Sequence, residues 1–77
     1  MKQEEWKNIF GDNLDAILKE KGMTQRQLSK DSGVSASMIS DYINGQRIPS
    51  VTAAINMAYA LDVDVNELID FDERVEL

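Results

Sequence analysis

The chain has 77 residues, 43% of them hydrophobic, and a formal net charge of −6, which is enough for one small domain. It contains no cysteine and no histidine, which excludes a disulfide framework, a thiol nucleophile, a Cys/His zinc site and an imidazole base. No apolar run approaches the roughly 18 residues of a membrane span, and the acidic start MKQEEW lacks the order of a signal peptide, so we expect a cytoplasmic protein without a membrane partner.

Two helices are predicted at the start of the chain. Apolar residues at helical spacing indicate a first amphipathic helix from about Glu5 to Lys21, ended by Gly22. These residues are Trp6, Phe10, Leu14, Ile17 and Leu18. A second helix begins after Thr24, which is placed to cap it, with Gln27 as the capping-box partner. It lasts two turns, because Gly33 permits the positive φ that redirects the chain.

Three further helices follow, each after its own cap. Ser35 is the N-cap of a third helix from Ala36 to about Asn44, although Met38 leaves its capping box incomplete. Ser50 caps a fourth helix, whose expected buried stripe comprises Val51, Ala54, Ile55, Ala58 and Leu61. Asp64 and Glu67 form a second capping box that opens a short fifth helix. No strand candidate remains, so the predicted fold class is all-α.

The third helix has an unusual outer face. At 100° per residue, Ile39 and Ile43 lie on one side with Tyr42 at the flank. The opposite side collects the small polar residues Ser37, Ser40, Asp41 and Asn44. Slim side chains suit a helix that enters a major groove about 12 Å wide, and two short helices joined by a glycine turn describe a helix-turn-helix unit. The alternative is an ordinary soluble helix with polar residues outside.

Charge is distributed unevenly along the chain. Residues 19–50 carry five basic and three acidic residues, a net charge of +2, whereas residues 51–77 carry one arginine and seven acids, a net charge of −6. A mildly positive middle segment can meet a polyanion if the acidic ends point away from it.

The stretch GMTQRQLSKDSGVSASMISDYINGQRIPS, followed by ALDVDVNELI, resembles the Cro/CI-type (XRE-like) family of transcriptional regulators over about residues 9–70. The resemblance implies a five-helix, lambda-repressor-like DNA-binding domain with a helix-turn-helix. It also implies a repressor or regulator that binds a roughly palindromic double-stranded DNA operator, commonly as a homodimer. On this basis residues 1–77 form a single domain, with a core at about 5–70 and an acidic tail at 71–77.

The resemblance also implies roles for individual residues. The base-reading positions are Ala36, Ser37, Ser40 and Asp41. The phosphate-binding candidates are Gln25, Arg26, Lys30, Asn44, Gln46 and Arg47, although a solvated surface charge is the alternative for Arg26, Lys30 and Arg47. A carboxylate near phosphates is repelled, so we expect Asp41 either to accept from a cytosine amino group or to pair with a cation such as Lys30 or Arg26.

Other functions have weaker support. Asp62 to Asn66 begin like an EF-hand calcium loop, but Glu67 stands where that loop needs glycine, and the capping box explains the same letters. Nothing pairs a nucleophile with a base, so we expect no enzyme, and no cofactor or small-molecule ligand is indicated. A protein-interaction module on the same scaffold, as in an antitoxin-like or regulatory subunit, is the alternative function.

Phe71, Val75 and Leu77 either cover the first helix or contribute to a contact between protomers.

Overall fold

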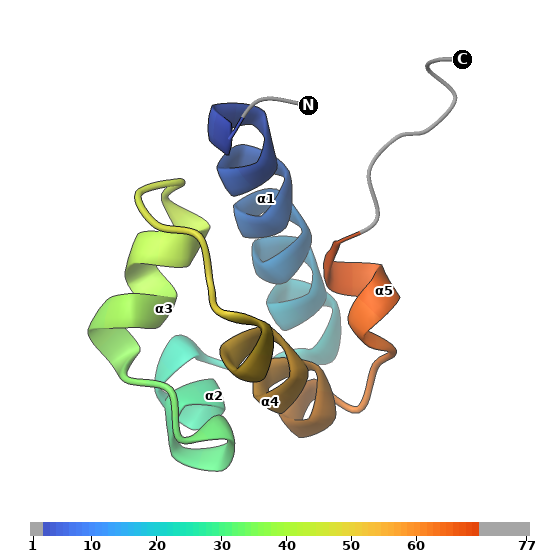
Figure 1. Cartoon of the computed structure of the whole chain (residues 1–77). Coiled ribbons are helices and arrows are strands. Elements are labelled where there is room, and N and C mark those ends of the chain that lie inside the picture. The colour runs from blue at the N-terminus through green and yellow to red at the C-terminus, as the bar shows by residue number, and fades with distance from the viewer. Residues whose placement is uncertain (1–2, 70–77) are drawn as a thin grey trace.

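The computed structural model describes residues 3–69, with side chains from 5 to 69, as five helices (Figure 1). They are α1 (Gln3–Lys21), α2 (Gln25–Ser32), α3 (Ala36–Ile43), α4 (Val51–Leu61) and α5 (Val65–Leu68). No strand occurs between residues 3 and 69, so the expected all-α, five-helix fold is confirmed. Helix α1 contacts α3, α4 and α5, and in Figure 1 α3 and α5 lie on opposite sides of it.

The helix boundaries follow the capping signals of the sequence. Thr24 Oγ1 accepts a hydrogen bond from the Gln27 N–H at 3.0 Å, and Gln27 Oε1 accepts one from the Thr24 N–H at 2.9 Å, so the predicted capping box is present. Asp64 and Glu67 form the second predicted box at α5, and the Ser50 side chain caps α4. Each cap satisfies an N–H group that an isolated helix start would leave unpaired.

Helix α1 begins at Gln3, before the expected Glu5, and ends as predicted. Gly22 has φ +65°, and the Met23 N–H donates to the Leu18 carbonyl at 2.9 Å, the bond that closes a Schellman motif. The left-handed glycine turns the chain directly into α2, so α1 and α2 are joined by a short connection.

The core is made of apolar side chains from all five helices and the α2–α3 turn. It comprises Phe10, Leu14, Ile17, Leu18, Leu28, Val34, Ile39, Tyr42, Ala54, Met57, Ala58, Leu61 and Leu68. Trp6 stacks on Phe10, with ring centroids 5.7 Å apart, and Tyr42 meets Phe10 edge to face at 5.9 Å. Tyr42 is therefore part of the core, and is 1% exposed, where the sequence had placed it at the flank of α3.

The predicted buried stripe of α4 was partly wrong. Ala54, Ala58 and Leu61 are buried, but Val51 is 75% exposed and Ile55 is 50% exposed. Helix α4 packs against α2, and Met57, which the predicted stripe left out, is fully buried, whereas Val51 and Ile55 lie on a face that remains exposed. An almost wholly apolar helix offers more than one face with helical spacing, and tertiary packing decides which is buried.

Gly11 sets the distance between α1 and α3. A Cβ atom at this position would lie 2.3 Å from the Tyr42 carbonyl oxygen and 2.8 Å from the Ile43 carbonyl oxygen. Only a residue without a side chain allows the two backbones to approach so closely. Glycine lowers the helix propensity of α1, but in return the end of α3 can pack closely against α1 at this position.

Helix α5 is joined to α1 by a hydrogen bond in which Asn13 Nδ2 donates to the Leu68 carbonyl oxygen at 2.9 Å. The Asp64 carboxylate accepts from the Asn66 N–H at 3.0 Å, as a helix cap does. The later positions of the calcium-loop alternative, Asp70 and Glu73, lie outside the described residues. So do Phe71, Val75 and Leu77.

Candidate nucleic-acid interface

The α2–α3 unit is a helix-turn-helix held together by its turn. Gly33 adopts φ +78° and its N–H donates to the Ser29 carbonyl at 2.9 Å, which ends α2. The Ser35 hydroxyl then accepts from the Met38 N–H at 3.2 Å and starts α3. Leu28, from α2, and the buried residues of the turn and α3 belong to one core cluster. The orientation of α3 is thus fixed, with one side in the core and the other outward.

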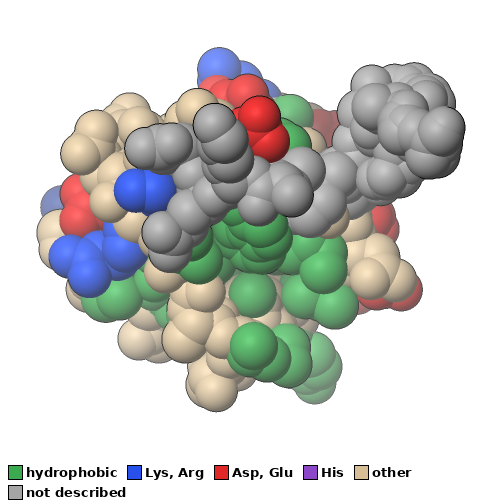
Figure 2. All heavy atoms as spheres, turned by 45° about the horizontal axis from the view of Figure 1, so that its top comes forward, with side chains coloured by type: hydrophobic (Ala, Val, Ile, Leu, Met, Phe, Trp, Pro, Cys, Tyr) green, Lys and Arg blue, Asp and Glu red, His purple; other side chains and the backbone are tan. Residues whose placement is uncertain are grey.

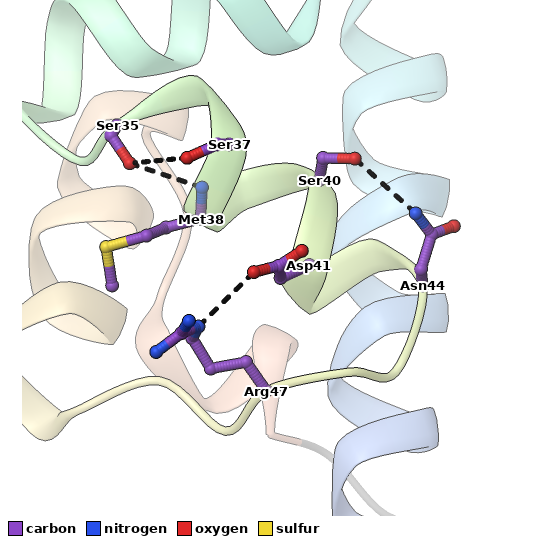
Figure 3. A network of polar contacts seen from close by, with 7 residues as sticks. All are labelled: Ser35, Ser37, Met38, Ser40, Asp41, Asn44 and Arg47. Carbon is purple, nitrogen blue, oxygen red and sulfur yellow. Dashed lines mark hydrogen bonds and ion pairs between the residues drawn. The ribbon is translucent and has the colours of Figure 1, made fainter.

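The four predicted base-reading residues are all accessible on the outer side of α3. Ala36 and Ser37 are exposed, and Ser40 and Asp41 are half-buried at the surface. Two contacts among the small polar groups of this side are long, 3.5 Å between the Ser35 and Ser37 hydroxyls and 3.4 Å from Asn44 Nδ2 to Ser40 Oγ (Figure 3). Hydroxyl and amide groups in such weak contacts keep donors and acceptors for an external ligand.

Asp41 pairs with Arg47, and not with Lys30 or Arg26 as the sequence suggested. Arg47 Nε lies 3.4 Å from Asp41 Oδ2, and both side chains remain accessible, at 54% and 41% exposure (Figure 3). The chain reverses after α3 because Gly45 adopts φ +72°, and the Gln46 N–H then donates to the Asp41 carbonyl at 2.8 Å. This reversal brings Arg47 back beside α3, which spacing along a helix does not predict.

The other phosphate-binding candidates lie at the surface on either side of α3. Gln25 is the first residue of α2, where backbone N–H groups lack intrahelical partners. Arg26 and Lys30 are exposed one turn apart on α2, and neither forms an ion pair within the described part of the chain. Asn44 caps the end of α3, and Gln46 is exposed in the following loop.

Tyr42 adds no charge to this region at neutral pH. Burial raises the pKa of its phenol above the ordinary value, Arg47 lowers that pKa in part, and the Asp41 carboxylate raises it further. At neutral pH the negative charge on α3 therefore comes from the carboxylate of Asp41 alone, and Arg47 lies beside that carboxylate.

A second surface was not expected from the sequence. Val51, Ile55 and Tyr59 stand one helical turn apart on α4 and are 75%, 50% and 88% exposed; we call them the α4 ridge. The ridge borders a groove of about 250 Å³ lined by Trp6, Ile48, Pro49, Ser50, Val51, Ala54, Ile55, Val65 and Ile69. In Figure 2 hydrophobic side chains gather in the middle of the view, with charged side chains towards its edges. The sequence feature that could have indicated this apolar surface is the complete lack of charged residues from 48 to 61.

Within residues 3–69, no helix is long and apolar enough to cross a membrane. No three acidic side chains there come together as a metal site.

Comparison with known proteins identifies relatives of similar size. A model of the helix-turn-helix family HTH_3 matches residues 14–68. The uncharacterized HTH-type transcriptional regulator y4dJ of Sinorhizobium fredii is 33% identical over 63 residues, 82% of each chain. The uncharacterized HTH-type transcriptional regulator YazB of Bacillus subtilis is 33% identical over 60 residues, which cover 78% of this chain and 87% of that one.

Solved structures share the fold. The restriction-modification controller protein C.AhdI from Aeromonas hydrophila is 32% identical, with a TM-score of 0.78 over 80% of this chain and 94% of that chain. An HTH_3 family transcriptional regulator from Vibrio cholerae is 18% identical, with a TM-score of 0.86 over 92% of this chain and 40% of that chain. The latter likeness concerns the fold alone.

Proposed function

The chain belongs to the helix-turn-helix (HTH_3) family of DNA-binding transcriptional regulators, and on that premise we propose that it recognises an operator sequence through α3 and represses transcription. The resemblance to Cro/CI-type, XRE-like regulators seen in the sequence is confirmed, and the family is one of regulators and not of enzymes. The 32% identity to a restriction-modification controller supports a regulatory role. The proposed place of action is the cytoplasm, on double-stranded DNA.

The observation that carries the proposal is the outer side of α3. Its exposed side chains are small and, apart from Asp41, uncharged, so the helix can approach base edges closely. Ala36 offers a methyl group for thymine, and Ser37 and Ser40 offer hydroxyls that donate or accept. The capped start of α2 near Gln25 is suited to a phosphate, because its free N–H groups carry partial positive charge.

Phosphate contacts at the edges of α3 complete the proposed mode. Arg26 and Lys30 on α2, and Asn44, Gln46 and Arg47 after α3, supply donors that position the helix without reading sequence. These cations belong to the segment with net charge +2, whereas seven of the 14 acidic residues follow residue 61. Repression follows if this domain occupies a promoter and blocks access of the polymerase.

Selection of binding sites from random duplex DNA tests the proposal. We expect a half-site to be enriched, and Ser37→Glu to abolish the enrichment, because it places a carboxylate against the groove. Ala16→Glu is the matched control, since it adds the same charge at an exposed position of α1. Affinity for the selected operator should fall as the salt concentration rises, provided that the protein concentration is high enough to keep the proposed dimer fully formed. Loss of enrichment in both variants, or salt-independent affinity, contradicts the proposed mode.

We propose that a second copy of the chain covers the α4 ridge and its groove, giving a two-fold homodimer. Two chains of net charge −6 repel each other, so they meet most favourably through a surface without charge. The ridge combines that property with an exposed tyrosine, a residue type enriched at interface cores, and with the apolar side chains of Val51 and Ile55. In Figure 1 α5 lies on the opposite side of α1 from α3, and no α3 residue lines the groove, so the proposed contact leaves both recognition helices free to enter major grooves about 34 Å apart.

The dimer is tested by replacing the ridge with a cation. Ile55→Lys lowers the net negative charge and therefore weakens general repulsion, yet we expect it to yield a monomer in sedimentation equilibrium, because it buries an ammonium in an apolar contact. Ala16→Lys makes the same charge change on α1 and should leave the dimer intact. A dimer that persists in Ile55→Lys contradicts this interface. A wild-type monomer that selects no duplex favours the protein-interaction alternative.

A further inference from the structure

The Asp41–Arg47 ion pair lies where the proposed function places DNA. Asp41 is on the outer side of α3 and Arg47 is in the loop that leaves it (Figure 3). One contact joins them, from Arg47 Nε to Asp41 Oδ2 at 3.4 Å. An arginine proposed to bind phosphate is therefore already in contact with a carboxylate, and the two anions compete for it.

The geometry allows this competition to be resolved by side-chain movement alone. The backbone bond from the Gln46 N–H to the Asp41 carbonyl, at 2.8 Å, holds the loop against α3 independently of the ion pair. Both charged groups are accessible, at 54% and 41% exposure, so the pair adds little to folding stability. Arginine has five N–H donors and uses one in this contact, which leaves the rest for another acceptor.

We propose, resting on the function proposed above, that Arg47 exchanges Asp41 for a DNA phosphate on binding, and that the released carboxylate selects cytosine through its exocyclic amino group. Guanine and thymine present only hydrogen-bond acceptors in the major groove, and adenine presents its amino donor beside the N7 acceptor, so an unpaired carboxylate meets a repelling acceptor on each of these bases. Asp41 therefore weakens binding to other sequences. Cytosine alone offers the carboxylate an amino donor without an acceptor beside it on the same base, and this donor replaces the arginine that phosphate has taken.

Asp41→Asn separates this role from a general effect of charge. Asparagine keeps the shape of the side chain, loses the charge that holds Arg47, and reads adenine in place of cytosine. Asp31→Asn is the matched control, because Asp31 is exposed on α2 and forms no ion pair between residues 5 and 69. Both variants change the net charge by the same amount, so their difference reports the position of Asp41 on α3 and not the loss of charge in general.

The measurements are the affinity for random duplex DNA and the selected operator sequence. We expect Asp41→Asn to tighten random-duplex binding about two- to five-fold more than Asp31→Asn does, the range for an exposed ion pair. We also expect one position per half-site to change from cytosine to adenine, with at least about fivefold loss of preference for cytosine. In an Arg47→Ala background, the part of the extra tightening that comes from releasing Arg47 should disappear, and any tightening that remains reports repulsion of the Asp41 carboxylate in the groove.

Two results overturn the inference. One is equal tightening by Asp41→Asn and Asp31→Asn, and the other is an unchanged selected base. Both presuppose a wild-type protein that binds DNA, so they leave the proposed function standing. If neither the wild type nor any of the variants enriches a duplex, the proposed function fails, and this inference fails with it.

Discussion

Gly11→Ala sets two physical effects against each other. By helix propensity, alanine within α1 is favoured over glycine by about 1 kcal/mol. The added Cβ, however, would lie 2.3 Å from the Tyr42 carbonyl oxygen and 2.8 Å from that of Ile43. Both atoms are backbone, so relief requires α1 and α3 to separate, and overpacking of this kind costs about 3 kcal/mol at the upper end of its usual range.

The expected net loss is about 2 kcal/mol, which in a domain of this size lowers Tm by roughly 8–16 °C. Thermal unfolding followed by circular dichroism measures it. Ala16→Gly, at an exposed position of α1, is the control for propensity and should cost about 1 kcal/mol. A Gly11→Ala protein as stable as the wild type, or more stable, would refute the reasoning, since propensity alone would then explain the position.

A functional consequence accompanies the loss of stability. The two carbonyl groups that approach Gly11 belong to the C-terminal turn of α3, so separating the helices displaces the proposed recognition helix. Operator affinity should therefore fall even at temperatures where Gly11→Ala is fully folded. Unchanged affinity in a folded variant would show that α3 keeps its place without this contact.

Three further predictions concern single interactions. Ser35→Ala removes the cap of α3 and should cost about 1 kcal/mol, or roughly 4–8 °C in Tm, measured by thermal unfolding. Burial raises the pKa of Tyr42, so the folded state holds the phenolic proton more tightly and the free energy of unfolding should fall as pH rises above about 10. Tyr42→Phe should make the free energy of unfolding, measured by denaturant titration, less dependent on pH in this range. Tyr59→Phe removes an exposed phenol and is the control. Asn13→Ala removes the donor to the Leu68 carbonyl, so α5 should exchange its amide hydrogens about fivefold faster, and unchanged exchange would show that packing alone holds it.

Local interactions explain what the sequence predicted well. Capping and left-handed glycine turns involve residues within a few positions of one another, so Thr24, Gly33 and Asp64 indicated helix boundaries without any knowledge of the fold. The outward side of α3 was also predictable, because Ile39 and Ile43 occupy the other side and the outer side carries small residues.

Features that depend on distant contacts were predicted less well. Val51 and Ile55 have helical spacing, but the face of α4 that is buried depends on where α2 packs. Tyr42 is buried because Gly11, 31 positions earlier, lets two backbones approach. Arg47 reaches Asp41 through a reversal at Gly45, which helical periodicity does not describe.

The uncharged α4 ridge on an anionic chain makes the proposed pairing of two chains dependent on ionic strength. Dissolved ions screen the repulsion between two copies of net charge −6 and so favour pairing, while the same ions weaken the hold of cationic side chains on phosphate. In dilute protein, operator occupancy is then expected to pass through a maximum at intermediate ionic strength. A change of ionic strength in either direction from that maximum would then lower occupancy of the proposed operator.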